Sequence, residues 1–582
     1  MTGKRLLSKR NCHVAFAIFF VALAVGVALV PYEPMEWDLA DATANYVWTG
    51  YYAEGRTHVS YDEWNSDWDG LRTQVVVVEH DGEYVVVNEK GPGLAAMLVP
   101  FRLAGAEFLF GPLMLAFAAI GTYLLGRRVG GWKVGLAAAA MVAANVIVLV
   151  MCHRYYWTDA ATMHLLVLGF ALFVESFYIL NGRTLDPREE GAVLSRRDWL
   201  VATALGILAG LSFGAAVSTR YAAALTILAL LCFLIAFYGI KLWPYLRKGE
   251  VKGTVGKSRG FIAALVFLLG LAVVLVPLCQ YNSEYFGGPF RSGYDATLIF
   301  KFDPAVGIDP RNTSTTWSAD IDEMASTAAS NFFLLLPTLC SKMPALLLAP
   351  FGIWMLRRKT ALALLLPWIA VGLATYLSLS WVDMYARLSP DVVWEPRYFM
   401  AVLPAIAILG AVPLARLSER GFKFHVERDE AVAVGGKAFA IAIVGIIALW
   451  GMAPAFGHFA QIGDDYQTPG GGPGGPDGGA VLNVTTDQLL QNPNEYEGKS
   501  VHLARATVVS AGFNSVHVRS DGSASNGSVP VRFEMWPPGA IPMLRAGDVV
   551  EVEGMFLRTP DGHALGVKFG TRNYVRIVDQ AP

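Results

Sequence analysis

The chain has 582 residues, of which 54% are hydrophobic and only 16% charged, and its formal net charge at pH 7 is -2. This composition excludes a soluble globular protein with an ordinary charged surface. It is the composition of an integral membrane protein.

Apolar stretches of about 18 or more residues, long enough to cross roughly 30 Å of hydrocarbon, recur through the first 456 residues. They predict a polytopic α-helical membrane protein with about eleven transmembrane helices. The predicted spans are 12–31, 107–126, 133–151, 160–180, 200–218, 221–240, 260–280, 337–356, 360–380, 397–415 and 438–456. We interpret the apolar pieces at 93–105 and 325–336 as helices that lie in the membrane interface.

Basic residues alternate between the predicted loops. The N-terminus and the segments after every second span hold more than half of the 46 Lys and Arg residues. The loop at 32–92, in contrast, has thirteen Asp or Glu residues against Arg56, Arg72 and Lys90. Short loops rich in Lys and Arg stay in the cytoplasm, so the pattern predicts a multi-pass cell-membrane protein with a cytoplasmic N-terminus. An odd number of spans then makes the C-terminus extracellular.

The composition changes after residue 456. Residues 457–480 contain a Gly- and Pro-rich run that is typical of a flexible linker. From 481 to 582 the apolar residues alternate with polar ones, which predicts five short strands at 500–509, 515–519, 530–534, 548–554 and 574–578. The chain therefore has three predicted parts: a transmembrane domain at 1–456 with the outer loop 32–92, a linker at 457–480, and an extracytoplasmic all-β barrel at 481–582.

The phrases that begin at Thr486 and Gly547 resemble those that precede strands in OB-fold proteins, whose barrels bind oligonucleotides or sugars. This part of the chain contains nine Lys or Arg residues and ten Asp or Glu residues. The absence of a net positive charge argues against binding of nucleic acid. A structural or glycan-facing role fits the barrel better.

Acidic residues recur where the outer loops meet the predicted spans. Asp38 and Asp41 follow the first span, and Asp159 stands where the fourth begins. Because carboxylates at the membrane edge cost desolvation energy, their recurrence favours a functional explanation. The structural alternatives are a solvated loop acid for the pair and a helix cap for Asp159.

The outer loops contain few cations, which makes those present informative. Lys90 belongs to the phrase Lys-Gly-Pro-Gly, and Arg220 and Arg397 each precede a Tyr at a membrane boundary. Guanidinium groups present a fork of donors that suits phosphate oxygens. The alternative is interfacial anchoring beside a Tyr at headgroup level. We interpret Tyr221, Tyr294 and Tyr398 as belt or packing residues.

Taken in order, the outer phrases resemble the GT-C type membrane glycosyltransferases, a superfamily that includes protein O-mannosyltransferases and the aminoarabinose transferases of lipid A. The phrases lie at 35–41, 88–93, 156–159, 218–221, 281–294 and 395–404. The resemblance covers about 30–456 and excludes the barrel. It implies a GT-C fold and inverting transfer of a sugar, on the outer face, from a polyprenyl-phosphate donor to a protein, lipid or glycan acceptor.

The resemblance also implies roles for individual residues. The base is Asp38 by its position just after the first span, with Asp41 as the alternative. Asp159 matches a second acidic position that orients the acceptor or helps to hold a metal. Lys90 aligns with a lysine that approaches the lipid phosphate, although this chain has Gly91 where many members have Pro. A divalent metal, if one binds, would use Asp38 and Asp159.

Rival function classes differ in where they place charge. A secondary transporter would have paired broken helices and charges at mid-bilayer depth. A polysaccharide polymerase or ligase that uses lipid-linked sugars would share the outer acids and cations. A scaffold that displays the barrel would need none of these phrases. The sugar, the acceptor and the choice between dolichol and undecaprenol are open at this level.

Overall fold

The computed structural model describes most of the chain. The described residues are 9–30, 32, 40–68, 75–189, 192–248, 259–293, 301–303, 307–309, 321–378, 395–420, 439–450, 452, 482–497, 499–511, 515–520, 528–534, 549–559, 562–568 and 574–579. The chain divides into two compact units, one made of residues 1–32, 45–64 and 75–459 and the other of 33–44, 65–74 and 460–582.

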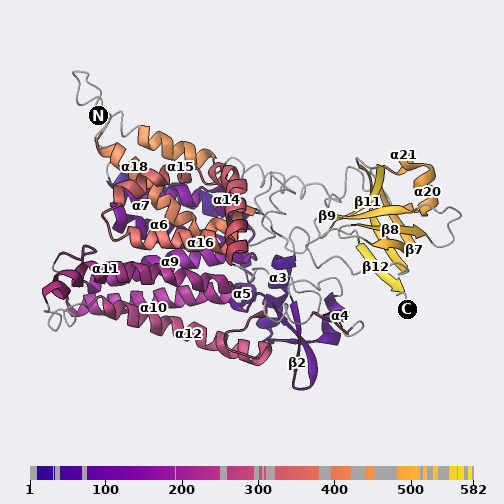
Figure 1. Cartoon of the computed structure of the whole chain (residues 1–582), viewed down its shortest axis with the longest axis horizontal. Coiled ribbons are helices and arrows are strands. Elements are labelled where there is room, and N and C mark those ends of the chain that lie inside the picture. The colour runs from indigo at the N-terminus through magenta and orange to yellow at the C-terminus, as the bar shows by residue number, and fades with distance from the viewer. Residues whose placement is uncertain are drawn as a thin grey trace. The chain divides into compact units, whose positions relative to one another are not determined.

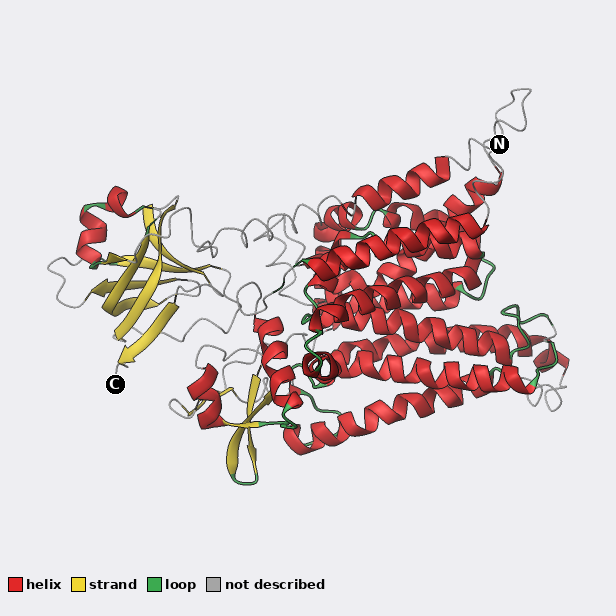
Figure 2. Cartoon of the chain, turned by 180° about the vertical axis from the view of Figure 1, so that it is seen from behind, coloured by secondary structure: helices red, strands yellow, loops and turns green. Residues whose placement is uncertain are grey.

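The first unit is a bundle of apolar helices (Figures 1 and 2). In chain order its main helices are α1 (Lys9–Leu29), α5 (Gly93–Leu103), α6 (Phe110–Gly130), α7 (Trp132–Ala143), α8 (Val146–His153), α9 (Thr158–Leu180), α10 (Arg196–Thr219), α11 (Ile227–Lys248), α12 (Phe261–Phe286), α14 (Ile321–Lys342), α15 (Ala345–Leu356), α16 (Leu362–Leu377) and α18 (Leu403–Arg420). Helix α9 lies inside the bundle, where it packs against α6, α10 and α12. Most of its side chains are buried.

Within the described residues, seven helices are long and apolar enough to cross a membrane, or up to nine if each of two bent pairs counts as one span. The fold class of a polytopic helical membrane protein is thereby confirmed. The predicted spans 360–380 and 438–456 coincide with shorter apolar helices, α16 and Phe439–Trp450. At 1.5 Å per residue the 16 residues of α16 extend about 24 Å, less than the hydrocarbon thickness.

Two predicted spans are bent rather than straight. Helices α7 and α8 meet at 57°, and Asn145 caps α8 by accepting hydrogen bonds from the backbone of Ile147 and Val148. Helices α14 and α15 meet at 97°. The predicted boundary at residue 337 is wrong, because α14 continues through Pro337 to Lys342. The chain bends instead before Pro344, since a proline disfavours the helical conformation of the residue before it.

A small antiparallel sheet precedes α5 and positions the segment around Lys90. Strands β1 (Val59–Ser60), β3 (Glu83–Asn88) and β2 (Val75–His80) pair in that order. β2 and β3 form a hairpin whose two-residue turn, Asp81-Gly82, has positive φ at both residues, which matches the twist of the strands. The apolar face of the hairpin packs on Tyr281, Tyr285 and Phe286 at the end of α12. Helix α3 (Ala40–Ala53) precedes β1 in the sequence, and α4 (Tyr61–Trp68) lies between β1 and β2.

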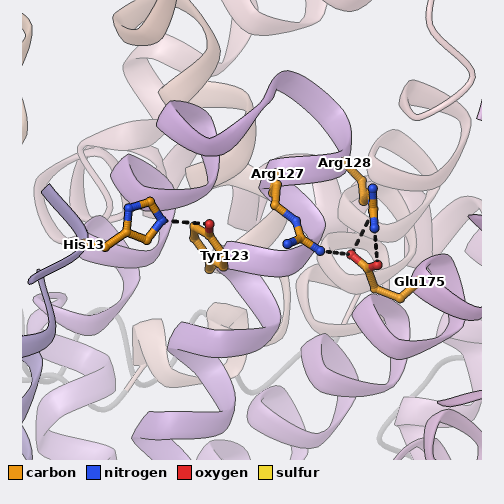
Figure 3. A network of polar contacts seen from close by, with 5 residues as sticks. All are labelled: His13, Tyr123, Arg127, Arg128 and Glu175. Atoms are coloured by element: carbon orange, nitrogen blue, oxygen red, sulfur yellow. Dashed lines mark hydrogen bonds and ion pairs between the residues drawn. The ribbon is translucent and has the colours of Figure 1, made fainter. Parts of the chain in front are cut away.

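Charged residues join α6 to the C-terminal part of α9 (Figure 3). Glu175 accepts hydrogen bonds from Arg128 Nε at 2.8 Å and from Arg127 Nη2 at 2.9 Å. The Arg128 guanidinium also lies 3.5 Å from the centroid of the Tyr178 ring. In the same figure His13 of α1 bonds the hydroxyl of Tyr123 at 2.8 Å. Arg127 and Arg128, which belong to the basic segment after the predicted span 107–126, therefore also hold helices together.

The second unit contains a β-barrel. Strands β7 (Ser500–Ala511), β8 (Ser515–Ser520), β9 (Val529–Glu534), β11 (Gly562–Lys568) and β10 (Val549–Thr559) pair in that order, and β10 pairs back with β7 to close the ring. β9 and β11 are parallel and the other ring pairs antiparallel. A five-stranded Greek-key ring of this kind is the OB-fold arrangement, so the prediction of a small OB-like barrel is confirmed. Short helices α20 (Thr486–Gln491) and α21 (Pro493–Tyr496) precede it.

All five predicted strands form, but the fifth lies outside the ring. The predicted strand at 574–578 is β12 (Tyr574–Asp579), which pairs with β10 outside the ring, and β6 (Leu482–Asn483) likewise adds to β7. The fifth ring strand is β11, whose sequence Gly-His-Ala-Leu-Gly-Val-Lys contains few β-branched residues and so carries a weak strand signal. Inward-facing Val501, Leu503, Val531 and Phe556 belong to the barrel core.

Candidate functional site

Three charged residues predicted separately from the sequence meet at one end of the bundle. Asp159 lies in the first turn of α9, Arg220 follows the last residue of α10, and Arg397 lies in a 3-10 helix, η5 (Glu395–Val402). Arg220 forms an ion pair with Asp159, and Arg397 Nε lies 3.4 Å from Asp159 Oδ2. The three side chains are 3%, 12% and 8% exposed, so two guanidinium groups share one carboxylate in a nearly closed environment.

Aromatic rings cover the two guanidinium groups. The Arg397 guanidinium lies 4.1 Å from the centroid of Trp157 and 4.6 Å from that of Tyr398. The Arg220 guanidinium lies 5.1 Å from Tyr398 and 5.2 Å from Tyr376. Arg397 Nη2 also donates a hydrogen bond of 2.7 Å to the Tyr398 hydroxyl. These contacts stabilise the cations through the ring faces and exclude water from them.

The Lys90 segment packs against the residues around Arg220. The backbone N–H of Lys90 donates to Asn88 Oδ1 at 3.0 Å, which begins a tight turn after β3. Gly91 has a φ of +89°, and a Cβ there would lie 3.0 Å from the carbonyl oxygen of Ser218. A Cβ at Gly93 would overlap Ser218 itself. The turn can approach the segment before Arg220 this closely only because both positions are glycine.

A further outer segment meets the same region. The hydroxyl of Tyr221 donates to Asn282 Oδ1 at 2.9 Å, and Asn282 Nδ2 donates to the carbonyl of Pro289 at 3.4 Å. A Cβ at Gly293 would overlap the backbone of Glu89, next to Lys90. The phrases around Lys90, Arg220 and Asn282, far apart in the sequence, are therefore neighbours in the fold.

The loop that precedes Asp159 is anchored by helix α3. Asn45 of α3 donates to the carbonyl of Tyr156 at 3.1 Å, and the Tyr156 hydroxyl donates to Glu107 at 2.5 Å. Burial first, and then the Glu107 carboxylate, raise the pKa of Tyr156, so this hydroxyl stays protonated and keeps its bond. Glu107 also pairs with Arg102 at 3.4 Å. The loop that leads to Asp159 is thus fixed from two sides.

The two acids predicted to follow the first span are described to different extents. Asp38 lies outside the described residues. Asp41 belongs to helix α3, one helical turn before Asn45, and its side chain is outside the described set. Tyr294 also falls outside it.

Asp159 as it stands is poorly suited to hold a metal, because each of its oxygens faces a guanidinium group. In the part of the chain that the structure describes, no group of three or more His, Cys, Asp or Glu residues could hold a metal ion.

Sequence reasoning missed the aromatic partners of the arginines. Tyr398 and Tyr221 were interpreted as belt or packing residues, yet Tyr398 contacts both arginines and Tyr221 binds Asn282. The adjacency of Tyr398 to Arg397 and of Trp157 to Asp159 was the available signal. Tyr376, which ends the apolar helix α16, carried none.

No family model and no curated protein matches the chain. Among solved structures, it is similar to ArnT from Cupriavidus metallidurans bound to undecaprenyl phosphate, with 14% identity, a TM-score of 0.45, and coverage of 81% of this chain and 83% of that one. It is also similar to the archaeal oligosaccharyltransferase AglB from Archaeoglobus fulgidus in complex with an inhibitory peptide and a dolichol-phosphate. There the identity is 14% and the TM-score 0.39, and the alignment covers 78% of this chain but only 56% of that one. At these identities the similarity concerns the fold alone.

Proposed function

We propose that the protein is an integral membrane glycosyltransferase of the GT-C type that moves a sugar from a polyprenyl-phosphate donor to a protein, lipid or glycan acceptor. The observation that carries this proposal is the contact of two buried guanidinium groups with the Asp159 carboxylate. A guanidinium group held in place presents a planar fork of N–H donors that matches the oxygens of a phosphate group. The phosphodiester of a polyprenyl-phosphate sugar supplies such oxygens.

The chemistry of transfer needs cations more than it needs an acid. When the acceptor oxygen attacks the anomeric carbon, the bond from that carbon to the donor phosphate oxygen breaks, and the phosphate leaves with an additional negative charge. Arg220 and Arg397 would stabilise that charge by donating hydrogen bonds to the phosphate oxygens. The Lys90 segment, which packs on the residues before Arg220, would bring a third cation to the same phosphate.

Asp159 would act as the counter-ion that orients the two arginines, since it contacts both. That role is distinct from taking the proton of the acceptor hydroxyl, which we assign to Asp38, with Asp41 as the alternative. Asn45, one helical turn after Asp41 on α3, donates a hydrogen bond to the carbonyl of Tyr156 in the loop before Asp159. Attack from the face opposite to the leaving phosphate inverts the anomeric carbon.

We place the site on the outer face, with a cytoplasmic N-terminus. The support is that Asp159 and Glu175 lie 16 residues apart on α9, about 24 Å, so the proposed site and the Arg127–Arg128 pair occupy opposite ends of one helix. Arg127 and Arg128 lie in the last turn of α6, and basic residues at the end of a span favour the cytoplasmic side.

The test is turnover of a radiolabelled polyprenyl-phosphate sugar in membranes that contain the wild type, Asp38→Asn or Asp41→Asn. Loss of turnover on the order of a hundredfold or more is expected for the residue that acts as base. Asp62→Asn, a change to an exposed acid of α4, is the matched control and should keep full turnover. If the wild type turns over no lipid-linked sugar in membranes but transports a solute when it is reconstituted in liposomes, the protein is instead a transporter.

A further inference from the structure

We propose that Tyr376 and Tyr398 are positioning residues that fix the spacing and direction of the two arginines, and so determine how tightly the donor phosphate is bound. The inference rests on the proposed function and names residues that the outer-loop phrases did not single out for this role. Tyr398 is the shared element, because its ring lies 5.1 Å from the Arg220 guanidinium and 4.6 Å from that of Arg397.

All five N–H donors of a guanidinium lie in its plane, so its hydrogen bonds form at its edges. One edge of each arginine is turned to Asp159. Tyr376 and Tyr398 lie against the same cation with ring centroids 5.6 Å apart and planes inclined by 31°. The rings therefore restrict rotation of the Arg220 side chain while Asp159 fixes its distance.

The two rings belong to separate elements of the fold. Their contacts therefore fix the positions of the two guanidinium groups relative to each other, in addition to filling space locally. Tyr376 lies in α16, Tyr398 in η5, and Arg220 follows α10. Movement of any of these elements would change the distance between the two guanidinium groups. A fork that must meet two oxygens of one phosphate tolerates little such change.

The two tyrosines differ in the group that does the positioning. For Tyr376 it is the ring face, which Phe would preserve and Leu would remove. For Tyr398 it is the ring together with the hydroxyl, which accepts the 2.7 Å hydrogen bond from Arg397. Phe399 supplies a matched control, because it is a buried aromatic of the same 3-10 helix that also lies against Tyr376, at a centroid distance of 6.4 Å.

The experiment measures the dissociation constant of a polyprenyl phosphate, the KM for the polyprenyl-phosphate sugar, and the thermal unfolding temperature of full-length protein in nanodiscs. The variants are Tyr376→Phe, Tyr376→Leu, Tyr398→Phe, Tyr398→Leu and Phe399→Leu. Tyr376→Leu should weaken binding and raise KM on the order of tenfold, whereas Tyr376→Phe should remain within about threefold of wild type. Tyr398→Phe should show a defect between those of wild type and Tyr398→Leu.

Phe399→Leu should lower the unfolding temperature as much as Tyr376→Leu does, yet leave binding within about twofold of wild type. The inference is overturned if Phe399→Leu weakens binding as much as Tyr376→Leu, or if Tyr376→Phe is as defective as Tyr376→Leu. If the wild type binds no polyprenyl phosphate, the proposed function itself is contradicted. If the wild type binds normally and none of the variants differs from it, only the positioning role of the two tyrosines is contradicted.

Discussion

Each end of helix α9 holds one carboxylate between two arginines, but the two arrangements differ in construction. At the Asp159 end the arginines come from separate segments, are covered by aromatic rings, and are 12% and 8% exposed. At the Glu175 end the arginines are consecutive residues of α6 and are 37% and 20% exposed (Figure 3). One carboxylate and two guanidinium groups thus join neighbouring helices at the Glu175 end, whereas at the Asp159 end they bring together segments that are far apart in the sequence.

This difference in construction is the reason why we assign the ligand to the Asp159 cluster. The Glu175 cluster joins two neighbouring helices, and its partly exposed Arg127 can find water as a partner. The Asp159 cluster gathers α9, α10 and η5 around charges that solvent hardly reaches. A fold has no need to assemble so many elements around two cations merely to pack them, since apolar residues of similar volume do this as well or better.

The largest predicted effect separates the two clusters by activity. Arg220→Gln should lower turnover of a polyprenyl-phosphate sugar by about 100- to 1000-fold, because it removes a donor to the leaving phosphate. Arg128→Gln, the same substitution at the other end of α9, should leave turnover per folded molecule within about twofold. Turnover is normalised to folded protein by size-exclusion chromatography. Equal losses in both variants would remove the functional distinction between the clusters.

The second prediction concerns stability at the Glu175 end. Glu175→Gln leaves two arginines without their carboxylate and should lower the free energy of unfolding by about 3 kcal/mol, at the lower end for a buried pair because Arg127 is partly exposed. Thermal unfolding in detergent measures this. KM for the donor should not change, and a raised KM would show that the cluster also acts on the site.

The third prediction disturbs the contact between the Lys90 turn and the segment before Arg220. Gly93→Ala places a methyl group where Ser218 lies, which should cost about 1–3 kcal/mol and lower turnover on the order of tenfold as the turn is displaced. Gly239→Ala in α11 is the control, because a Cβ there meets nothing within 4 Å. Normal turnover in Gly93→Ala would separate Lys90 from the site.

The smallest predicted effect tests the third segment of the site. Tyr221→Phe removes the hydroxyl that donates to Asn282 and should cost about 1 kcal/mol of stability, with less than a threefold rise in KM. Denaturation of the purified variant and donor titration check the two values. A rise in KM of tenfold or more would mean that Tyr221 contacts the donor directly.

The fold could be predicted from the sequence wherever one physical signal was dominant. The apolar runs give the helices, but nothing in their hydrophobicity reveals that the chain bends by 97° before Pro344. Alternating apolar residues predict β7 to β10 and β12, whereas β11, with its two glycines and an alanine, does not stand out and was not predicted.

The site could be predicted only in part for a similar reason. Asp159, Arg220 and Arg397 stand out because charge at a membrane boundary is rare, and the structure brings them together. Tyr376 is one aromatic among many in an apolar helix, so its place beside Arg220 follows only from tertiary packing. The pairing of Asp159 with both arginines was likewise not predicted, because the sequence offered the acids and the cations as partners of different substrates.

Donor binding is the decisive measurement for the role of Arg220. Purified wild type, Arg220→Gln and Arg128→Gln in nanodiscs are titrated with a polyprenyl phosphate, and the dissociation constants are compared. We expect a loss of affinity of at least about tenfold in Arg220→Gln, since a charge-assisted hydrogen bond contributes roughly 1.5–3 kcal/mol, and no change in Arg128→Gln. Equal affinity in Arg220→Gln and wild type would show that Arg220 does not bind the donor phosphate.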